Sequence, residues 1–263
     1  MRRKILPYFI LAFNLNQFAC QSTLQETASQ AVASDPFAHI DDLEARRILA
    51  GACQFAGGLD QWKNRKAISF AKQTVLYDST EQVESTLSQR IKLQNKPQTK
   101  VDIKWNANGI SHQISYEGAK ATKIENGQNQ TPSDPTGLNN AILSARYVMS
   151  IPFELLKTGY KLSYLGLDTL SGGQIVHVLK ARYETTENDG ETDTWWHYYH
   201  QTTFQQLGYK VQHADHFSLV ENLAFVKNGG FMWPVRRKSY RVNERGEKLF
   251  LRADYTYGAY EVE

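Results

Sequence analysis

Hydrophobic residues recur along the chain with two different periods. The first is helical, over residues 43–56, where apolar side chains return every three or four positions. Asp41 and Asp42 precede this stretch and Gly57-Gly58 follows it. Acidic residues favour the start of a helix and glycine favours its end, so this pattern predicts a helix from about 43 to 56.

A second helical stretch lies in the middle of the chain. Asp134-Pro135 is suited to its start, and residues 138–149 carry an apolar stripe. Pro152 interrupts the stripe, since proline cannot continue a helix, and a shorter apolar turn follows at 153–156.

Most of the remaining chain has the two-residue period of β-strands. Val101, Ile103 and Trp105, for example, alternate with charged residues, which gives such a strand one apolar and one polar face. Turn residues divide the chain into about ten or eleven such strands. The clearest are 83–93, 100–105, 110–117, 161–165, 174–183, 194–200, 209–213, 235–242 and 248–257. We therefore predict a mainly β (α+β) fold, with one large curved antiparallel sheet whose concave face is covered by the two helical stretches.

The N-terminus has the pattern of an export signal. Arg2-Arg3-Lys4 is a positive segment, and the apolar run 5–13 is shorter than the roughly 20 residues that a membrane-spanning helix needs. Phe18-Ala19-Cys20 resembles the cleavage site of bacterial lipoproteins, in which the cysteine becomes the lipidated first residue. We predict a lipoprotein signal peptide over 1–19 with lipid attached to Cys20; a plain secretory signal or an N-terminal anchor is the alternative.

The rest of the chain divides into two parts. Residues 20–38 are polar and small and predict a tether. Residues 39–263 contain no repeat or linker and predict a single β-domain. Cys53 would then be the only cysteine beside Cys20, so no internal disulfide is expected, and its place on a helical apolar stripe predicts a buried, unreactive side chain.

The charge of the chain excludes nucleic acid as a partner. The formal net charge is +3, from 30 Lys and Arg against 27 Asp and Glu. Three of the basic residues lie in Arg2-Arg3-Lys4, so removal of 1–19 leaves 27 basic and 27 acidic residues. A neutral domain lacks the basic surface that binding to phosphate backbones requires.

Three stretches carry a resemblance to a known superfamily. They are the helix end running into Ala56-Gly57-Gly58-Leu59-Asp60-Gln61-Trp62-Lys63 with the strand from Ala67, then Ser150-Ile151-Pro152-Phe153-Glu154-Leu155-Leu156 with the strands after it, and Met232-Trp233-Pro234-Val235-Arg236-Arg237-Lys238-Ser239-Tyr240. In this order they resemble the LolA/LolB-like periplasmic lipoprotein carriers, and within them a family of uncharacterised secreted bacterial lipoproteins. The resemblance covers about 40–260. It implies a half-open β-barrel with an apolar concavity closed by helices, used in characterised relatives to shield acyl chains, and no catalytic site.

Aromatic residues and methionine mark a candidate ligand cavity on the concave face. The candidates are Trp105, Tyr116, Trp196 and Tyr198 as the lining and Met149 and Phe153 as the lid. Such a cavity could hold an acyl chain or another apolar molecule, or the same side chains could simply fill the core.

Two polar clusters have weaker chemical interpretations. His213-Ala214-Asp215-His216, with His197 and His200, could bind zinc, but a solvated hairpin end explains it better because alternate residues of a strand face opposite sides. Arg236-Arg237-Lys238 could contact lipid headgroups or form the solvated face of a strand. We expect no cofactor, no metal and no catalysis.

These observations predict a monomeric cell-envelope lipoprotein that faces the periplasm, is anchored through Cys20 at the outer membrane, and binds a lipid or other apolar ligand in its half-barrel. A structural envelope lipoprotein that docks a protein partner and has no small-molecule ligand is the alternative. A metal-dependent hydrolase using His213 and His216 is the third hypothesis.

Overall fold

Thirteen antiparallel strands form one continuous sheet in the computed structural model, which describes residues 35–118, 120–183 and 193–263. The strands are β1 (Ala67–Tyr77), β2 (Val83–Gln94), β3 (Lys100–Ala107), β4 (Ile110–Glu117), β5 (Lys120–Glu125), β6 (Gln128–Gln130), β7 (Tyr160–Thr169), β8 (Ile175–Tyr183), β9 (Thr194–His200), β10 (Gln206–Gln212), β11 (Phe217–Asn228), β12 (Phe231–Val242) and β13 (Lys248–Val262).

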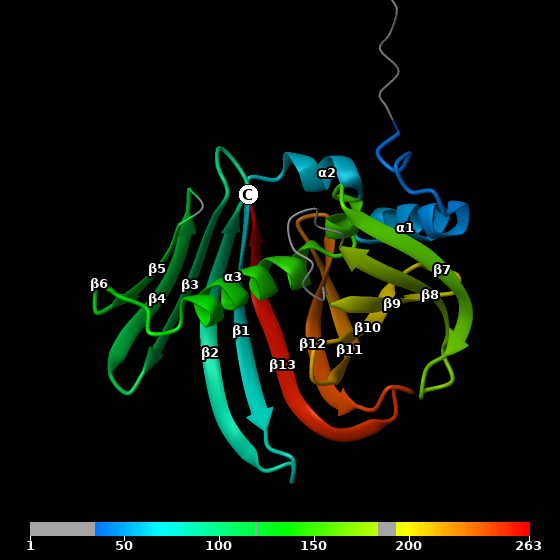
Figure 1. Cartoon of the computed structure of the whole chain (residues 1–263). Helices are drawn as coiled ribbons and strands as arrows, with labels where there is room; N and C mark the ends of the chain where they lie inside the picture. Colours follow the sequence, from blue (N-terminus) through cyan, green and yellow to red (C-terminus); the bar gives the residue numbers. More distant parts are fainter. Residues whose placement is uncertain (1–34, 119, 184–192) are drawn as a thin grey trace, which may run out of the picture. The chain divides into compact units, whose positions relative to one another are not determined.

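The strand order is β6-β5-β4-β3-β2-β1-β13-β12-β11-β10-β9-β8-β7, and every neighbouring pair is antiparallel. The chain runs outward from β1 to β6, starts again at β7 on the far edge, and returns until β13 pairs with β1 (Figure 1). Because β6 and β7 do not pair with each other, the curved sheet stays open along one side. The predicted fold class, a mainly β half-open barrel, is confirmed.

The sheet has more strands than the sequence pattern predicts, and β11 is the main addition. In β11 the apolar and polar residues do not keep one alternation, because the register with β12 shifts between Asn222 and Ala224 and again between Ala224 and Phe225. Each shift inserts a residue and moves the following side chains to the other face. The alternation therefore breaks in the middle of a continuous strand.

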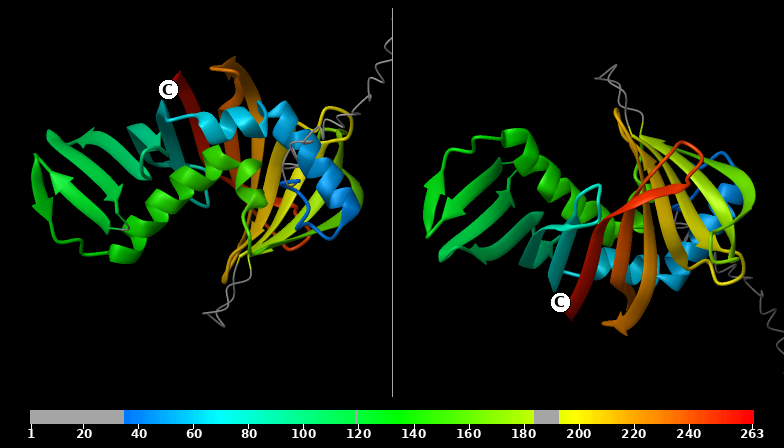
Figure 2. Two further views of the ribbon diagram at one scale, coloured as in Figure 1. Left: turned by 90° about the horizontal axis from the view of Figure 1, so that it is seen from above. Right: turned by 90° about the horizontal axis from the view of Figure 1, so that it is seen from below.

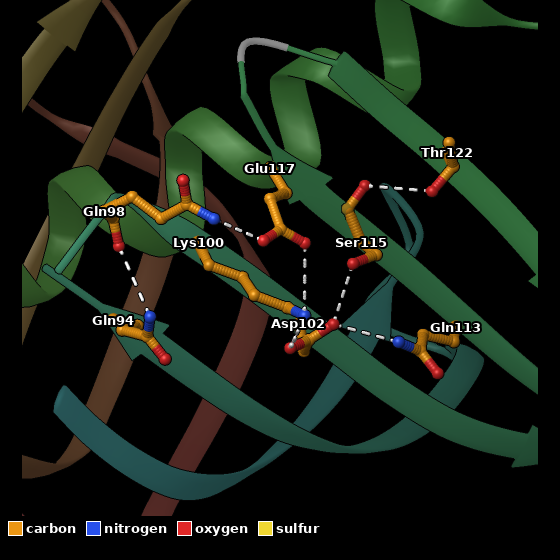
Figure 3. A network of polar contacts seen from close by, with 8 residues as sticks. All are labelled: Gln94, Gln98, Lys100, Asp102, Gln113, Ser115, Glu117 and Thr122. Atoms are coloured by element: carbon orange, nitrogen blue, oxygen red, sulfur yellow. Dashed lines mark hydrogen bonds and ion pairs between the residues drawn. The ribbon is translucent and has the colours of Figure 1, made fainter. Parts of the chain in front are cut away.

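The outer face of β3 and β4 shows the polar half of the predicted alternation (Figure 3). Asp102 accepts hydrogen bonds from Gln113 Nε2 and Ser115 Oγ, both at 2.9 Å, and Lys100 lies 3.4 Å from Glu117. Val101, Ile103 and Ile114, the next residues in each strand, are buried on the inner face. The outer face is thus held by polar contacts, whereas the inner face packs in the core.

Helix α1 (Leu43–Phe55) begins and ends as predicted. Asp42 caps its first turn by accepting from Ala45 N at 3.0 Å, and its second carboxylate oxygen accepts from Tyr164 N of β7 at 2.8 Å. At the other end Gly57 has a φ of +126°, which favours glycine, and short helix α2 (Leu59–Asn64) follows.

Helix α3 (Pro135–Ser150) and the short 3-10 helix η1 (Phe153–Leu156) connect the two halves of the sheet. Asp134 caps α3 through Gly137 N at 2.8 Å, with proline at the first helical position, as predicted. Ile151 takes an extended conformation before Pro152 and ends the helix.

The two long helices cover different parts of the concave face (Figures 1 and 2). Leu138, Ile142 and Met149 of α3 pack in one core cluster with residues of β1–β4, β12 and β13. The buried stripe of α1 packs in a second cluster with η1 and with β7, β8 and β9. In the part of the chain that the structure describes, no helix is long and apolar enough to cross a membrane.

Candidate functional site

A narrow pocket lies where the two core clusters meet, beneath the helices and above β9–β12. It is lined by Ala52, Phe55 and Ala56 of α1, by Val148, Met149, Ile151, Pro152 and Phe153 of the α3–η1 segment, and by Tyr199, Gln206, Asn222, Phe225, Phe231, Met232, Trp233, Pro234 and Arg237 of the sheet. It encloses about 40 Å³, which is room for a few water molecules or one small chemical group.

Aromatic rings make the apolar side of the pocket rigid. Phe153 stacks on Trp62 with ring centroids 4.4 Å apart, and Phe231 meets the same indole edge-on at 5.9 Å. Trp233 lies 5.3 Å from Phe231, and its Nε1 donates to the carbonyl of Asn228 at 3.1 Å. This wall joins η1, α2 and β12, so it depends on all three elements being in place.

The other side of the pocket is polar. Tyr199 is fully buried and Arg237 is 3% exposed, and both side chains line the pocket. The Tyr199 hydroxyl, Arg237 Nε and Asn222 Oδ1 are buried atoms with no hydrogen-bond partner. Buried polar atoms are almost always paired, since an unpaired one costs about 1–3 kcal/mol, so this group calls for a partner that enters the pocket.

Arg237 is the charged residue among these three. In the described part of the chain it forms no ion pair, whereas neighbouring Arg236 on the opposite face pairs with Asp254 at 3.1 Å. The guanidinium lies 5.4 Å from the ring centroid of Tyr209 and interacts with the phenol groups of Tyr209 and Tyr257. The aromatic rings stabilise the cation without neutralising it.

A buried histidine beside the pocket holds α3 to the sheet. His197 Nε2 and the Tyr147 hydroxyl of α3 form a hydrogen bond of 3.3 Å, and Nδ1 lies 3.1 Å from Gln206 Nε2. Complete burial lowers the pKa of His197 to about 3, because the charged ring would lose its hydration. His197 is therefore a neutral structural residue at neutral pH.

The predicted cavity residues separate into three groups. Met149 and Phe153 line the pocket. Trp105 and Tyr116 face the same concave side but pack farther along the sheet, against the cluster that contains Leu138 and Ile142.

Trp196 and Tyr198 differ from the expectation. They pack with Val176 and Val178 on the opposite face of β9 from Tyr199. The segment Trp-Trp-His-Tyr-Tyr-His carries aromatic side chains at both parities, so alternation alone did not identify its inner face. On this outer face the ammonium group of Lys210 lies 4.4 Å from the ring centroid of Trp196.

The predicted lipid-attachment residue, Cys20, lies outside the described residues. Cys53 is buried as predicted, and burial raises the pKa of its thiol to about 12.

The histidines that the sequence grouped lie in separate places. His213 Nδ1 is 3.0 Å from Asp193, and the His213 and His216 rings lie 4.6 Å apart at a tight turn. His197 is inside the core, and His200 Nδ1 accepts from the backbone of Thr202. Over the described ranges, no three His, Cys, Asp or Glu side chains are arranged to hold a metal ion.

Sequence reasoning did not name Tyr199 or Asn222, and it considered Arg237 only within the run Arg236-Arg237-Lys238, as a contact to lipid headgroups or a solvated strand face. A signal for Arg237 was present, because it continues the inward parity of Trp233 and Val235 and so places a charge among apolar positions. Asn222 interrupts β11 at a register shift, and nothing in its neighbours marked it as inward.

Comparison with known proteins identifies the fold. No protein-family model and no curated protein sequence matches the chain. A solved LolA superfamily protein from Nitrosomonas europaea is similar at a TM-score of 0.53 and 14% identity, over 83% of this chain and 93% of that one. A DUF1329 family protein from Desulfovibrio piger is similar at a TM-score of 0.52 and 9% identity, over the same shares. The chain therefore has a LolA-like fold, as its motifs predicted.

Proposed function

We propose that this protein is a non-catalytic cell-envelope lipoprotein that binds a lipid or another apolar chain between its helices and the concave face of its sheet. The observation that carries the proposal is the pocket itself: an apolar aromatic wall and a helical cover on a sheet that stays open at both edges. The LolA-like fold supports the same function, since a curved sheet of this kind can present a continuous apolar face to a ligand.

Binding of a chain requires the pocket to widen. Small-molecule sites usually occupy about 300–1,000 Å³, well above the 40 Å³ enclosed here. The segment Ile151–Leu156 is the part of the cover that would have to move, since Phe153 both lines the pocket and stacks on Trp62. An outward shift of Phe153 would join the pocket to the concave surface beneath α3.

Native mass spectrometry of the full chain, purified from bacterial membranes in a mild detergent, tests this proposal. We expect a fraction of the protein to retain one lipid after the detergent is removed in the gas phase. The variant Phe153→Trp, which adds bulk to the cover, should lower that fraction, whereas the exposed Leu249→Trp should not. Protein that never carries a lipid, and binds none when oleic acid is added, would refute the proposal.

We also propose that Cys20 is acylated and holds the domain at the outer membrane, facing the periplasm. Stable anchoring needs more than one acyl chain, and a lipoprotein cysteine carries several. The variant Cys20→Ala should move the protein from the membrane fraction to the soluble fraction. Unchanged membrane fractionation of that variant would contradict the assignment.

A second candidate function is docking of a protein partner. The observation that favours it is on the edge strand β7, where Leu165 and Leu167 are about half exposed and the backbone edge is unpaired within the sheet. Affinity purification from solubilised membranes would then recover a stoichiometric partner without lipid, and Leu165→Glu with Leu167→Glu would abolish its recovery. Retention of the partner by this variant would exclude the β7 edge as the docking site.

A further inference from the structure

The concave face holds positive charge with no acidic residue beside it. Arg237 on β12 is one cation, and Lys72 on β1 is the second, with its ammonium 5.1 Å from the ring centroid of Tyr255. Neither forms an ion pair within the described residues, although the exposed Arg90 and the partly buried Arg252 do. Burial and the positive charge of Arg237 lower the pKa of Lys72 to about 8. The two cations therefore repel each other across the concave face.

Burial of a cation without a counter-ion is unfavourable unless another group supplies the negative charge. The phenol groups around Arg237 are neutral at physiological pH, since burial raises the pKa of Tyr255 to about 12 and also raises that of Tyr257. The interior therefore offers aromatic contact and hydrogen bonds but no anion. A negatively charged group that enters the pocket would meet a site already electrostatically complementary to it.

Two of the three unpaired atoms, Arg237 Nε and the Tyr199 hydroxyl, are the kind of donor that such a group requires. Arg237 and Asn222 are register neighbours on β12 and β11, and Tyr199 of β9 lines the same pocket. Guanidinium N–H groups and a phenol hydroxyl are donors that suit a carboxylate or phosphate oxygen. Asn222 Nδ2 is already committed to the carbonyl of Gln206 at 3.0 Å, so Asn222 presents an acceptor oxygen that would take a bridging water or a hydroxyl beside the acidic group.

We propose that the pocket binds the acidic head of an anionic amphiphile, a carboxylate or phosphate attached to an apolar chain, with Arg237 as its charge partner and Tyr199 as a second donor. This inference rests on the proposed function and specifies its ligand. The enclosed volume suits a headgroup, and the half-buried Phe55, Phe225 and Met232 offer an apolar path for the start of the chain.

The test compares ligands that share one tail and differ in the head. The full chain with Cys20→Ala, freed of lipid, is titrated with oleate, oleyl phosphate and oleyl alcohol below their micelle concentrations, with the change in tryptophan fluorescence as the signal. We expect oleate or oleyl phosphate to bind at least tenfold more tightly than oleyl alcohol, since a charged hydrogen-bonded pair is worth about that much or more. The stronger of the two acids identifies the head.

Variants then assign the preference to the pocket. Arg237→Gln should weaken binding of the preferred acid at least tenfold and change binding of oleyl alcohol less than twofold. Arg236→Gln, next to it on the outer face, should change neither. Tyr199→Phe keeps the ring and removes the hydroxyl, so it should weaken only the acid, and it serves in place of Arg237→Gln if that variant does not fold.

The outcomes separate this inference from the proposed function. Equal binding of acid and alcohol by the parent protein, or equal effects of Arg237→Gln and Arg236→Gln, would overturn the anionic headgroup and leave apolar binding intact. Failure of the parent protein to bind any of the three ligands would overturn the proposed function itself. Loss of acid binding in both Arg237→Gln and Tyr199→Phe, with alcohol binding retained, would establish the site.

Discussion

Acidification should destabilise the protein through His197, and the structure sets the size of the effect. The folded state holds the pKa of this ring at about 3, whereas an unfolded histidine titrates near 6.5, at about 1.36 kcal/mol per pH unit. Between these values the unfolded state binds a proton that the folded state excludes. Stability from this residue is therefore complete above about pH 6.5 and is lost as the pH falls toward 3.

At pH 4.5, two pH units below the unfolded pKa, the loss from His197 alone is about 3 kcal/mol. Carboxylates contribute further losses, so the change must be isolated by comparison. His197→Gln lowers stability at pH 7.5 because it breaks the contact with Tyr147, but it has no ring to titrate. Between pH 7.5 and 4.5 its free energy of unfolding should fall by about 3 kcal/mol less than that of the parent protein.

Urea unfolding followed by circular dichroism at the two pH values measures this difference. The variant His39→Gln is the matched control, since it makes the same substitution at an exposed position. If His197→Gln lost as much stability on acidification as the parent protein does, His197 would not be held neutral in the fold, and the account of its burial would be refuted.

Three further predictions concern the ends and the interior of α1. Asp42→Ala removes the acceptor for both Ala45 N and Tyr164 N, so it should lower the free energy of unfolding by about 2 kcal/mol in urea unfolding. The control Asp41→Ala should lower it by less than about 0.5 kcal/mol, and equal losses would contradict the capping role. Gly57→Ala would bring a methyl group within 2.6 Å of the Phe231 ring at a φ of +126°. In the same assay it should lower the free energy of unfolding by at least about 1 kcal/mol more than Gly246→Ala, where φ is also positive but the space is open. A smaller difference would mean that Phe231 moves freely. Cys53, with its raised pKa and buried position, should resist iodoacetamide in the native Cys20→Ala protein and react fully in guanidinium, as mass spectrometry can show; rapid native labelling would mean that α1 opens readily.

The sequence was most informative where one local rule decided the structure. The helix over 43–55 follows from its apolar spacing, an acidic cap and two glycines, and these are interactions within a few residues. Strands β3 and β4 follow from alternation because their pairing has no register shift. In β11 two shifts change which side chains face inward, and such shifts depend on the partner strand rather than on the strand's own residues.

The site was harder to predict than the fold because it is formed by residues that are unusual for their positions. Met149 and Phe153 were found as apolar residues near a proline. Arg237 was considered with Arg236 and Lys238 as part of a charged run. Successive residues of a strand face opposite sides, so Arg237 points into the core while Arg236 and Lys238 point outward. The interpretation of Arg237 as a binding residue depends on the absence of an acidic neighbour within the described fold. The sequence of one strand does not show which residues of other strands lie beside it.

The sheet is completed by its last strand, because β13 pairs with β1, the first strand in the sequence. Strands β1–β4 come before α3, which packs on them, whereas β7–β9 pack against α1, which precedes every strand. Folding thus depends on contacts between distant segments, which makes it slow. For the exported lipoprotein proposed above, such a topology postpones completion of the sheet until β13 is available, and this favours the unfolded chain that passage through a narrow translocation channel requires.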